Sequence, residues 1–206
     1  MFVPMVGRAR SRRWTYLAHL ITGAVPRRGD LAGELPSAEI ESWFSPAPPA
    51  LSQGPTDPAM RAALEAAPAH LLRAAAARET MRLAALLHLD GTPGLAEAVA
   101  AAERGEGVTV SPESELGVHV RSWLARSRRA GRSLNDFACS KMNDDERNAA
   151  FMLGWFAKAL HAALWHEPRA AARGALHPLT KGPAPLRDPA QEAALLDLLR
   201  SGTESM

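Results

Sequence analysis

The run from Asn143 to Glu167, NDDERNAAFMLGWFAKALHAALWHE, constrains the fold of this chain more than any other stretch. It opens with a helix start signal, because the side chain of Asn143 can accept from a free backbone N–H and Glu146 can reach back to complete a capping box. Large apolar side chains, including Met152 and Phe156, then recur at helical spacing. Burying each of them stabilises the fold by roughly 1.5–3 kcal/mol. The run is therefore predicted to form a core helix.

The same run contains a pattern that suggests a metal site, His161 and His166 followed by Glu167. Two ligands on one helix share a face when they are three or four residues apart. Five residues at about 100° each place the two histidines roughly 140° apart around the helix. The spacing favours one solvated histidine and one at the rim of the core. A helical metal-dependent enzyme using these residues is kept as an alternative.

Residues 128–151 raise the question of a helix-turn-helix motif. Ser133 and Asp136 predict the start of a short helix, and a turn near Met142 would lead into the long one. A recognition helix presents its N-terminal turn to DNA. Here that turn holds the carboxylates at 144–146, which repel phosphates. The pattern therefore argues against DNA recognition through this element.

The remaining helices are marked by a capping residue followed by proline, and by glycine near the end. Helices are predicted over about 11–22, 37–44, 58–89, 93–104, 112–130 and 189–200, with prolines dense between 24 and 57 and between 176 and 187. Within 58–89, Pro68 is expected either to kink the helix or to start a new one. The pattern predicts an all-α protein, an irregular bundle of about seven to nine helices with proline-rich connectors.

The expected organisation is an irregular arm at 1–10 and a helical domain at 11–175 that includes the Pro-rich loop at 24–57. An extended connector and a C-terminal amphipathic helix are expected over 176–206. No repeat period joins the helices, so a solenoid is not predicted.

Composition limits the possible environments. Hydrophobic residues make up 47% of 206 residues, which is enough for a core, and the formal net charge is only +2. Cys139 is the single cysteine, so the chain forms no internal disulfide. No apolar run reaches the roughly 20 residues of a membrane span. Polar His19 and Thr22 interrupt the signal-like N-terminus, and we expect a cytoplasmic protein.

Motifs for enzymatic chemistry are missing. The sequence has no Walker loop, GxGxxG, GxSxG, HExxH, CxxC or EF-hand pattern. Cys139 is interpreted as a small packing residue and not as a nucleophile paired with a histidine. We expect neither enzymatic activity nor a cofactor.

Three surfaces suit contacts with a partner: a pair of aromatic residues, an arginine-rich helix face and a leucine-rich C-terminal helix. Their residues are Trp43 and Phe44; Arg121, Arg128, Arg129 and Arg132; and Leu195 and Leu199. A strapped-down loop and a solvated helix face are the ordinary explanations of the first two.

The leading hypothesis is a non-enzymatic helical interaction protein that binds another protein. It would be an adaptor, a chaperone-like protein or an accessory subunit of a larger bacterial assembly, such as a secretion machine. The Ala-, Arg- and Pro-rich composition is typical of a high-GC bacterium, but no motif carries the comparison with secretion subunits. The alternative from another class is a nucleic-acid-binding regulator that uses the basic face from Arg121 to Arg132.

Overall fold

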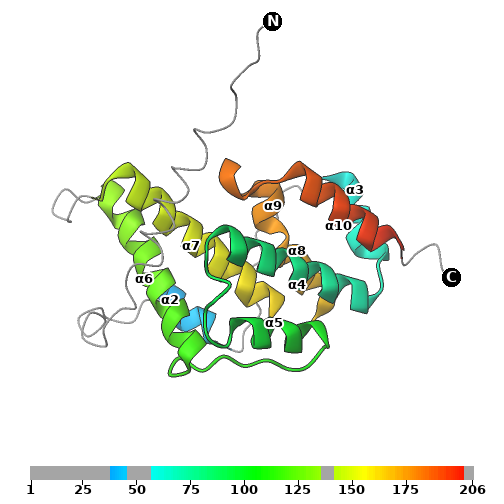
Figure 1. The fold of residues 1–206 in the computed structure, drawn as a ribbon, viewed down its shortest axis with the longest axis horizontal. Coiled ribbons are helices and arrows are strands. Elements are labelled where there is room, and N and C mark those ends of the chain that lie inside the picture. The colour runs from blue at the N-terminus through cyan, green and yellow to red at the C-terminus, as the bar shows by residue number, and fades with distance from the viewer. Residues whose placement is uncertain (1–37, 46–56, 136–141, 202–206) are drawn as a thin grey trace, which may run out of the picture.

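The computed structural model describes residues 38–45, 57–135 and 142–201, and all regular secondary structure in these ranges is helical (Figure 1). The predicted all-α, multi-helix architecture is therefore confirmed. The predicted arm at 1–10, the predicted helix at 11–22, most of the Pro-rich stretch at 24–57, and Cys139 lie outside the described residues.

The helices are numbered in chain order, as in Figure 1. Their bounds are α2 Ala38–Trp43, α3 Pro58–Ala66, α4 Ala69–Leu86, α5 Leu95–Glu103, α6 Glu115–Asn135, α7 Asp144–Ala163, α8 Pro168–Ala175, α9 His177–Lys181, the 3₁₀-helix η1 Ala184–Leu186 and α10 Pro189–Ser201.

Side-chain caps start several of these helices as the sequence predicts. The Asn143 side chain accepts from the backbone N–H of Glu146 at 2.9 Å, and the Glu146 carboxylate accepts from the backbone N–H of Asn143 at 3.1 Å, which completes the capping box of α7. The carboxylate of Asp57 accepts from the N–H of Met60 at the start of α3. Asp188 does the same at α10.

Two predicted helix ends are wrong. The helix at α4 ends at Leu86, not near Leu89 and Gly91, because His88 adopts the left-handed conformation with φ 56°. At the other site, α6 continues through Gly131 to Asn135. A glycine in a helix interior costs only about 1 kcal/mol, and the fully buried Ala130 keeps this part of α6 packed. No separate helix begins at Ser133, so the helix-turn-helix interpretation loses its first element.

The expected extended connector over 176–187 is also wrong in part. Residues His177–Lys181 form α9, and residues Ala184–Leu186 form η1. Proline occupies one of the first positions of both elements, where its missing N–H costs nothing. The helix α8, which Glu167 caps through both carboxylate oxygens, was not predicted as an element.

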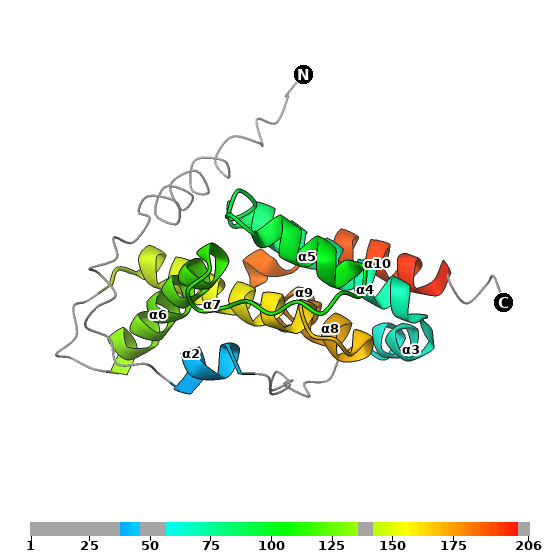
Figure 2. The same cartoon turned by 90° about the horizontal axis from the view of Figure 1, so that it is seen from below.

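The long helix α7 lies at the centre of the bundle, as predicted for the run from Asn143. It packs against α6, α8, α4, α9 and α5, and it crosses the middle of the molecule in Figure 1. Seen from below in Figure 2, α4, α5 and α10 form one side of the bundle, and α2 lies at the opposite side beside α6. The helix α10 closes the end of the bundle against α3 and α4.

The core consists of two apolar clusters that α4 and α7 join. The first lies among α4, α5, α6 and α7 and includes the fully buried Leu83, Leu95, Leu153 and Phe156. The second lies among α3, α4, α8, α9 and α10 and includes Met60, Leu72, Leu176, Leu195 and Leu199. Among the described helices, none combines the length and the apolarity that crossing a bilayer requires.

Candidate functional site

The helix α6 carries a concentrated excess of positive charge. Its sequence, ELGVHVRSWLARSRRAGRSLN, contains five arginines and one glutamate, a formal charge of +4. The whole chain has a formal charge of +2, so all the residues outside α6 together sum to −2. The net charge of the protein therefore comes from a single helix.

The outward side of α6 holds what we call the arginine face, Arg121, Arg128, Arg129 and Arg132. Arg121, Arg128 and Arg132 are seven and four residues apart, so at about 100° per residue they lie within roughly 20° of one line along the helix. Arg128, Arg129 and Arg132 are exposed, and Arg121 is half-buried with its Nε atom inside the structure. The accessible part of the face is thus its C-terminal half.

Apolar packing on the opposite side of α6 fixes the direction of this face. Leu116, Val120, Trp123 and Leu124 are buried there. The ring of Trp123 meets Phe156 of α7 edge-on, with 5.2 Å between ring centroids. Because this side of α6 is held against α7, the arginine face is turned away from the bundle.

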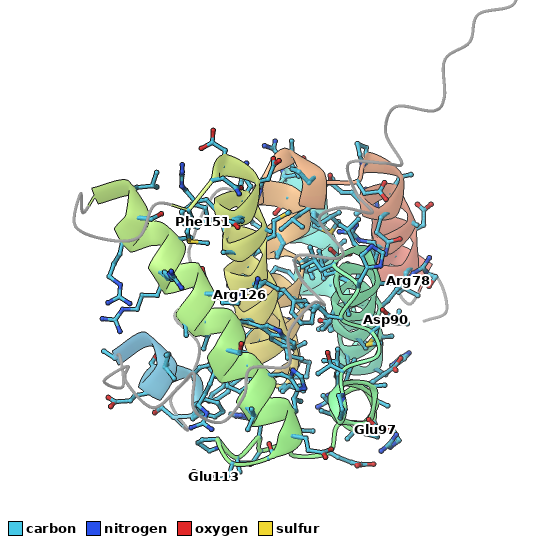
Figure 3. All side chains as sticks on the ribbon, turned by 60° about the vertical axis from the view of Figure 1, so that its left-hand side comes forward. Arg78, Asp90, Glu97, Glu113, Arg126 and Phe151 are labelled. Atoms are coloured by element: carbon cyan, nitrogen blue, oxygen red, sulfur yellow. The ribbon has the colours of Figure 1, made fainter. Side chains whose placement is uncertain are left out.

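Arg126 is the fifth arginine of α6, and it belongs to the flank rather than to the outward face. Figure 3 shows it between α6 and α7, whereas Arg78 of α4 lies on the other side of the molecule. Partial burial lowers the pKa of Arg126, and the nearby carboxylate of Glu146 acts in the opposite direction. Arg126 therefore contributes to the α6–α7 contact.

Apolar and acidic groups adjoin the arginine face at the same end of the α6–α7 pair. Leu134 is 58% exposed, and it is the exposed large hydrophobic residue of the described chain. The first turn of α7 carries Asp144, Asp145 and Glu146. Within the described residues, no ion pair engages Arg128 or Arg129. This end of the bundle therefore offers both signs of charge and an apolar side chain to a partner.

The structure places the aromatic candidates differently from the hypothesis of a displayed docking pair. Trp43 is buried, and its Nε1 donates a hydrogen bond to the carbonyl oxygen of Ala157 at 2.8 Å. Phe44 is half-buried and packs edge-on against Trp43, with 4.9 Å between centroids. Both residues belong to the packing of α2 on the bundle, which matches the ordinary explanation of a strapped-down segment.

The leucine candidates of the C-terminal helix are corrected in the same way. Leu195 and Leu199 are fully buried in the second apolar cluster. They lie on the side of α10 that packs against α3 and α4, so they close the core and are not available to a partner. The three candidate surfaces do not come together, because α10 lies at the other end of the bundle from α2 and α6 (Figure 1).

The histidines of the metal hypothesis have separate surroundings. His161 packs against Trp43, with 5.0 Å between ring centroids, and burial lowers its pKa. His166 is exposed and packs against Trp165, with 4.7 Å between centroids. In the part of the chain that the structure describes, no three His, Cys, Asp or Glu side chains gather as metal ligands would.

The sequence did not predict two features, a buried ion pair and an aromatic stack. Glu79 is fully buried in α4 and accepts two hydrogen bonds from Arg82, at 2.8 and 2.7 Å. Arg82 also donates to the carbonyl oxygen of Leu186 at 2.8 Å and so holds η1 against α4. The available signal was a glutamate three residues before an arginine on a helix that is otherwise alanine- and leucine-rich.

The second missed feature is an aromatic stack between α7 and α9. Trp155 and His177 are stacked with 5.3 Å between centroids and an interplanar angle of 25°. The sequence offered no signal for this contact, since α9 was expected to be an extended connector.

Comparison with known proteins adds no further information, because no protein-family model matches the chain and no curated protein or solved structure shows significant similarity to it.

Proposed function

We propose that this protein is a non-enzymatic interaction protein that binds an acidic surface of another protein through the arginine face of α6. The observation that carries the proposal is the concentration of charge: α6 has a formal charge of +4 in a chain of +2, with Arg128 and Arg129 exposed on its outward side. Arginine is well suited to such contacts because its planar guanidinium binds carboxylates in a bidentate manner.

The chemistry around the arginine face supports a protein as the partner. The exposed Leu134 is suited to burial against another apolar side chain. Asp144 and Asp145, in the first turn of α7, require a partner that also presents cationic or neutral groups. A protein surface supplies all three kinds of group, and charge complementarity of this type sets specificity and association rate.

A nucleic-acid-binding regulator is the second candidate, since the same arginines support it. Phosphate contacts depend on arginine and lysine and are strongly weakened by salt. The acidic turn of α7 at the end of the arginine face opposes this candidate. The assignment to the cytoplasm and to a larger bacterial assembly remains a prediction from composition.

Affinity purification with a charge-reversed arginine face tests the proposal. The variant Arg128→Glu/Arg129→Glu is compared with the native protein and with Arg78→Glu/Arg187→Glu, which changes the charge equally at exposed positions outside α6. We expect the bound protein to be lost from the first variant and kept by the second, as measured by quantitative mass spectrometry and then by titration of the purified partner. Equal retention by both variants contradicts the proposal.

Titration with duplex DNA and with RNA at increasing salt separates the two candidates. Binding that falls steeply with salt and disappears in Arg128→Ala/Arg129→Ala supports the nucleic-acid candidate. If nucleic acid binding is weak and unchanged in that variant, the nucleic-acid candidate is wrong.

A further inference from the structure

The outward side of α7 carries aromatic side chains where a surface helix usually carries polar ones. Phe151 and Trp155 are four residues apart, so they lie on one stripe of the helix, and both are half-buried. Trp155 packs against the first apolar cluster and stacks on His177. Phe151, which Figure 3 shows on the side of α7 toward α6, belongs to neither cluster, and within the described residues it meets no other ring. The described bundle therefore covers this stripe only in part.

Acidic side chains lie at the start of the same stripe. Asp144 is seven residues before Phe151, which places the two about 20° apart around the helix. The Asp144 side chain is 87% exposed, although it accepts a hydrogen bond from Arg147 at 2.9 Å. Asp145 is exposed, and no cation of the described residues forms an ion pair with it. The outward side of α7 thus changes from acidic to aromatic in the direction in which the chain runs.

The N-terminal part of the sequence, which lies outside the described residues, has the complementary order. Four arginines come first, and they are Arg8, Arg10, Arg12 and Arg13. The helix predicted over 11–22 then places Trp14, Leu17 and Ile21 on one face, because they are three and four residues apart. A helix of this sequence lying parallel to α7 would bring its arginines beside the acidic turn and its apolar face over the aromatic stripe.

The chain between this predicted helix and α2 is long enough for such a contact. The described chain begins at Ala38 of α2, and Trp43 of α2 is hydrogen-bonded to Ala157 of α7 at 2.8 Å. The stretch 23–37 has 15 residues, and at about 3.3 Å per residue it spans up to roughly 50 Å. The 20 residues of α7 are only about 30 Å long. The N-terminal segment can therefore reach any part of α7 within its own molecule.

We propose that residues 11–22 dock as a helix along the outward stripe of α7, within the same molecule and parallel to it. The arginines at the start of the segment meet the acidic turn of α7, and its apolar face covers Phe151 and the exposed part of Trp155. Burial of apolar area stabilises the contact, and the charges set its direction. The arginine face of α6 points away from α7 and stays uncovered, so this contact does not depend on the partner proposed for that face.

A nitroxide on the N-terminal segment tests the contact in the full-length chain. His19 lies about 140° from Trp14 around the predicted helix, away from its apolar face. The label is attached in His19→Cys/Cys139→Ser, which has a single thiol. We expect the oxidised label to cause a strong loss of amide NMR intensity at Phe151 and Trp155, and none at Leu199 of α10, when compared with the reduced label. Equal intensities at Phe151 and Trp155 with the two forms of the label overturn the proposal.

Charge reversal in the segment tests its direction on α7. Arg12→Glu/Arg13→Glu places acidic groups beside the acidic turn and is expected to abolish the loss of intensity at Phe151. The matched control Arg27→Glu/Arg28→Glu changes the charge by the same amount outside the predicted helix, and it is expected to keep the loss. The same effect of both variants would show that the arginines before Trp14 do not pair with α7 and would overturn the proposal.

Reversal of the acidic turn provides the complementary experiment. Asp144→Arg/Asp145→Arg is combined with Arg12→Glu/Arg13→Glu, which restores opposite charges across the contact. We expect the loss of intensity at Phe151 to return in the combined variant, and thermal unfolding shows that each variant is folded. A combined variant that is folded but shows no loss of intensity contradicts the pairing.

A mixed sample distinguishes docking within one molecule from docking between two. Protein that carries the nitroxide but no ¹⁵N is mixed with ¹⁵N-labelled protein that has no nitroxide. We expect full intensity at Phe151 in the mixture, whereas a loss there would place the segment of a second copy on α7 and would overturn docking within the molecule. Arg128→Glu/Arg129→Glu removes the arginine face and is expected to leave the effect of the label unchanged, so the two proposals fail independently.

Discussion

The indole Nε1 of Trp43 donates a hydrogen bond to the carbonyl oxygen of Ala157, across 114 positions of the chain, at 2.8 Å. Ala157 lies in the middle of α7, so this bond ties the short helix α2 to the centre of the bundle. The Trp43 ring also contacts His161, with 5.0 Å between centroids, and it is buried in the first apolar cluster. A helix of six residues has little stability alone, and this anchor explains why α2 holds its place.

Removal of the Trp43 ring is expected to destabilise the protein by roughly 3–5 kcal/mol in Trp43→Ala, because a large buried side chain leaves a cavity. The conservative Trp43→Phe keeps an aromatic ring but not the donor, and it is expected to cost less, with the lost hydrogen bond contributing about 1 kcal/mol. Urea unfolding measures both values. Equal stability of Trp43→Ala and the native protein would show that α2 does not pack on α7.

Truncation of Phe156 tests the role of α7 as the core helix. Phe156 is fully buried and packs edge-on against Trp123, so Phe156→Ala is expected to cost roughly 3–5 kcal/mol. Any loss of partner binding should follow from unfolding, because Phe156 does not reach the surface. Thermal unfolding is recorded beside partner binding. A variant that stays fully folded yet loses binding would contradict this and would point to a functional role for the interior of α7.

The contact of Gly154 with Ser127 sets how closely α6 and α7 approach. A Cβ atom at Gly154 would lie 2.2 Å from the Ser127 Oγ and 2.9 Å from its Cβ. Gly154→Ala is therefore expected to destabilise the protein by about 1–3 kcal/mol, although alanine is the better helix former. The double variant Gly154→Ala/Ser127→Gly restores the space and should recover part of the loss in urea unfolding. No recovery would show that the two positions do not meet.

The sequence predicts those parts of the fold that depend on local signals. The capping box at Asn143 and the apolar spacing of Met152 and Phe156 are local, and the structure confirms α7 as the central helix. The end of α4 was misplaced because His88 takes a left-handed conformation that glycine was expected to supply at Gly91.

The long-range contacts of the candidate surfaces are not local, and the sequence predicts them poorly. Amphipathic spacing marks Leu195 and Leu199 as one face but does not say whether that face meets the protein's own core or a partner. The outward direction of Arg128 was predicted correctly, because a charged side chain on the helix side opposite a buried apolar stripe faces the solvent. The buried Glu79–Arg82 pair was missed, since Arg82 also binds the carbonyl oxygen of Leu186 in η1, a contact between distant segments.

Breakage of the Glu79–Arg82 pair is expected to be costly, because it leaves a buried carboxylate without its partner. We expect Arg82→Met to destabilise the protein by about 3–5 kcal/mol. The double variant Glu79→Leu/Arg82→Met removes both charges, and its free energy of unfolding is expected to be much closer to that of the native protein. A residual loss of about 1–3 kcal/mol is expected for the unpaired carbonyl of Leu186. Urea unfolding of the single and double variants gives the coupling energy. Additive losses would show that the two side chains do not interact.

The protonation of Glu79 is expected to make the stability of the protein depend on pH. Burial raises the pKa of Glu79 above its ordinary 4.5, and the Arg82 guanidinium only partly offsets this. Between the unfolded and the folded pKa the folded state therefore binds more protons than the unfolded state, and the free energy of unfolding falls as pH rises through that window. The stabilisation that comes from the raised pKa of Glu79 is complete below the pKa of the unfolded state, and it is lost above the pKa of the folded state. Glu79→Gln has no proton to release at this position. We therefore expect the native protein to lose stability relative to Glu79→Gln as the pH rises through this range, as measured by urea unfolding. A difference that moves the other way would show that the Arg82 ion pair dominates over burial.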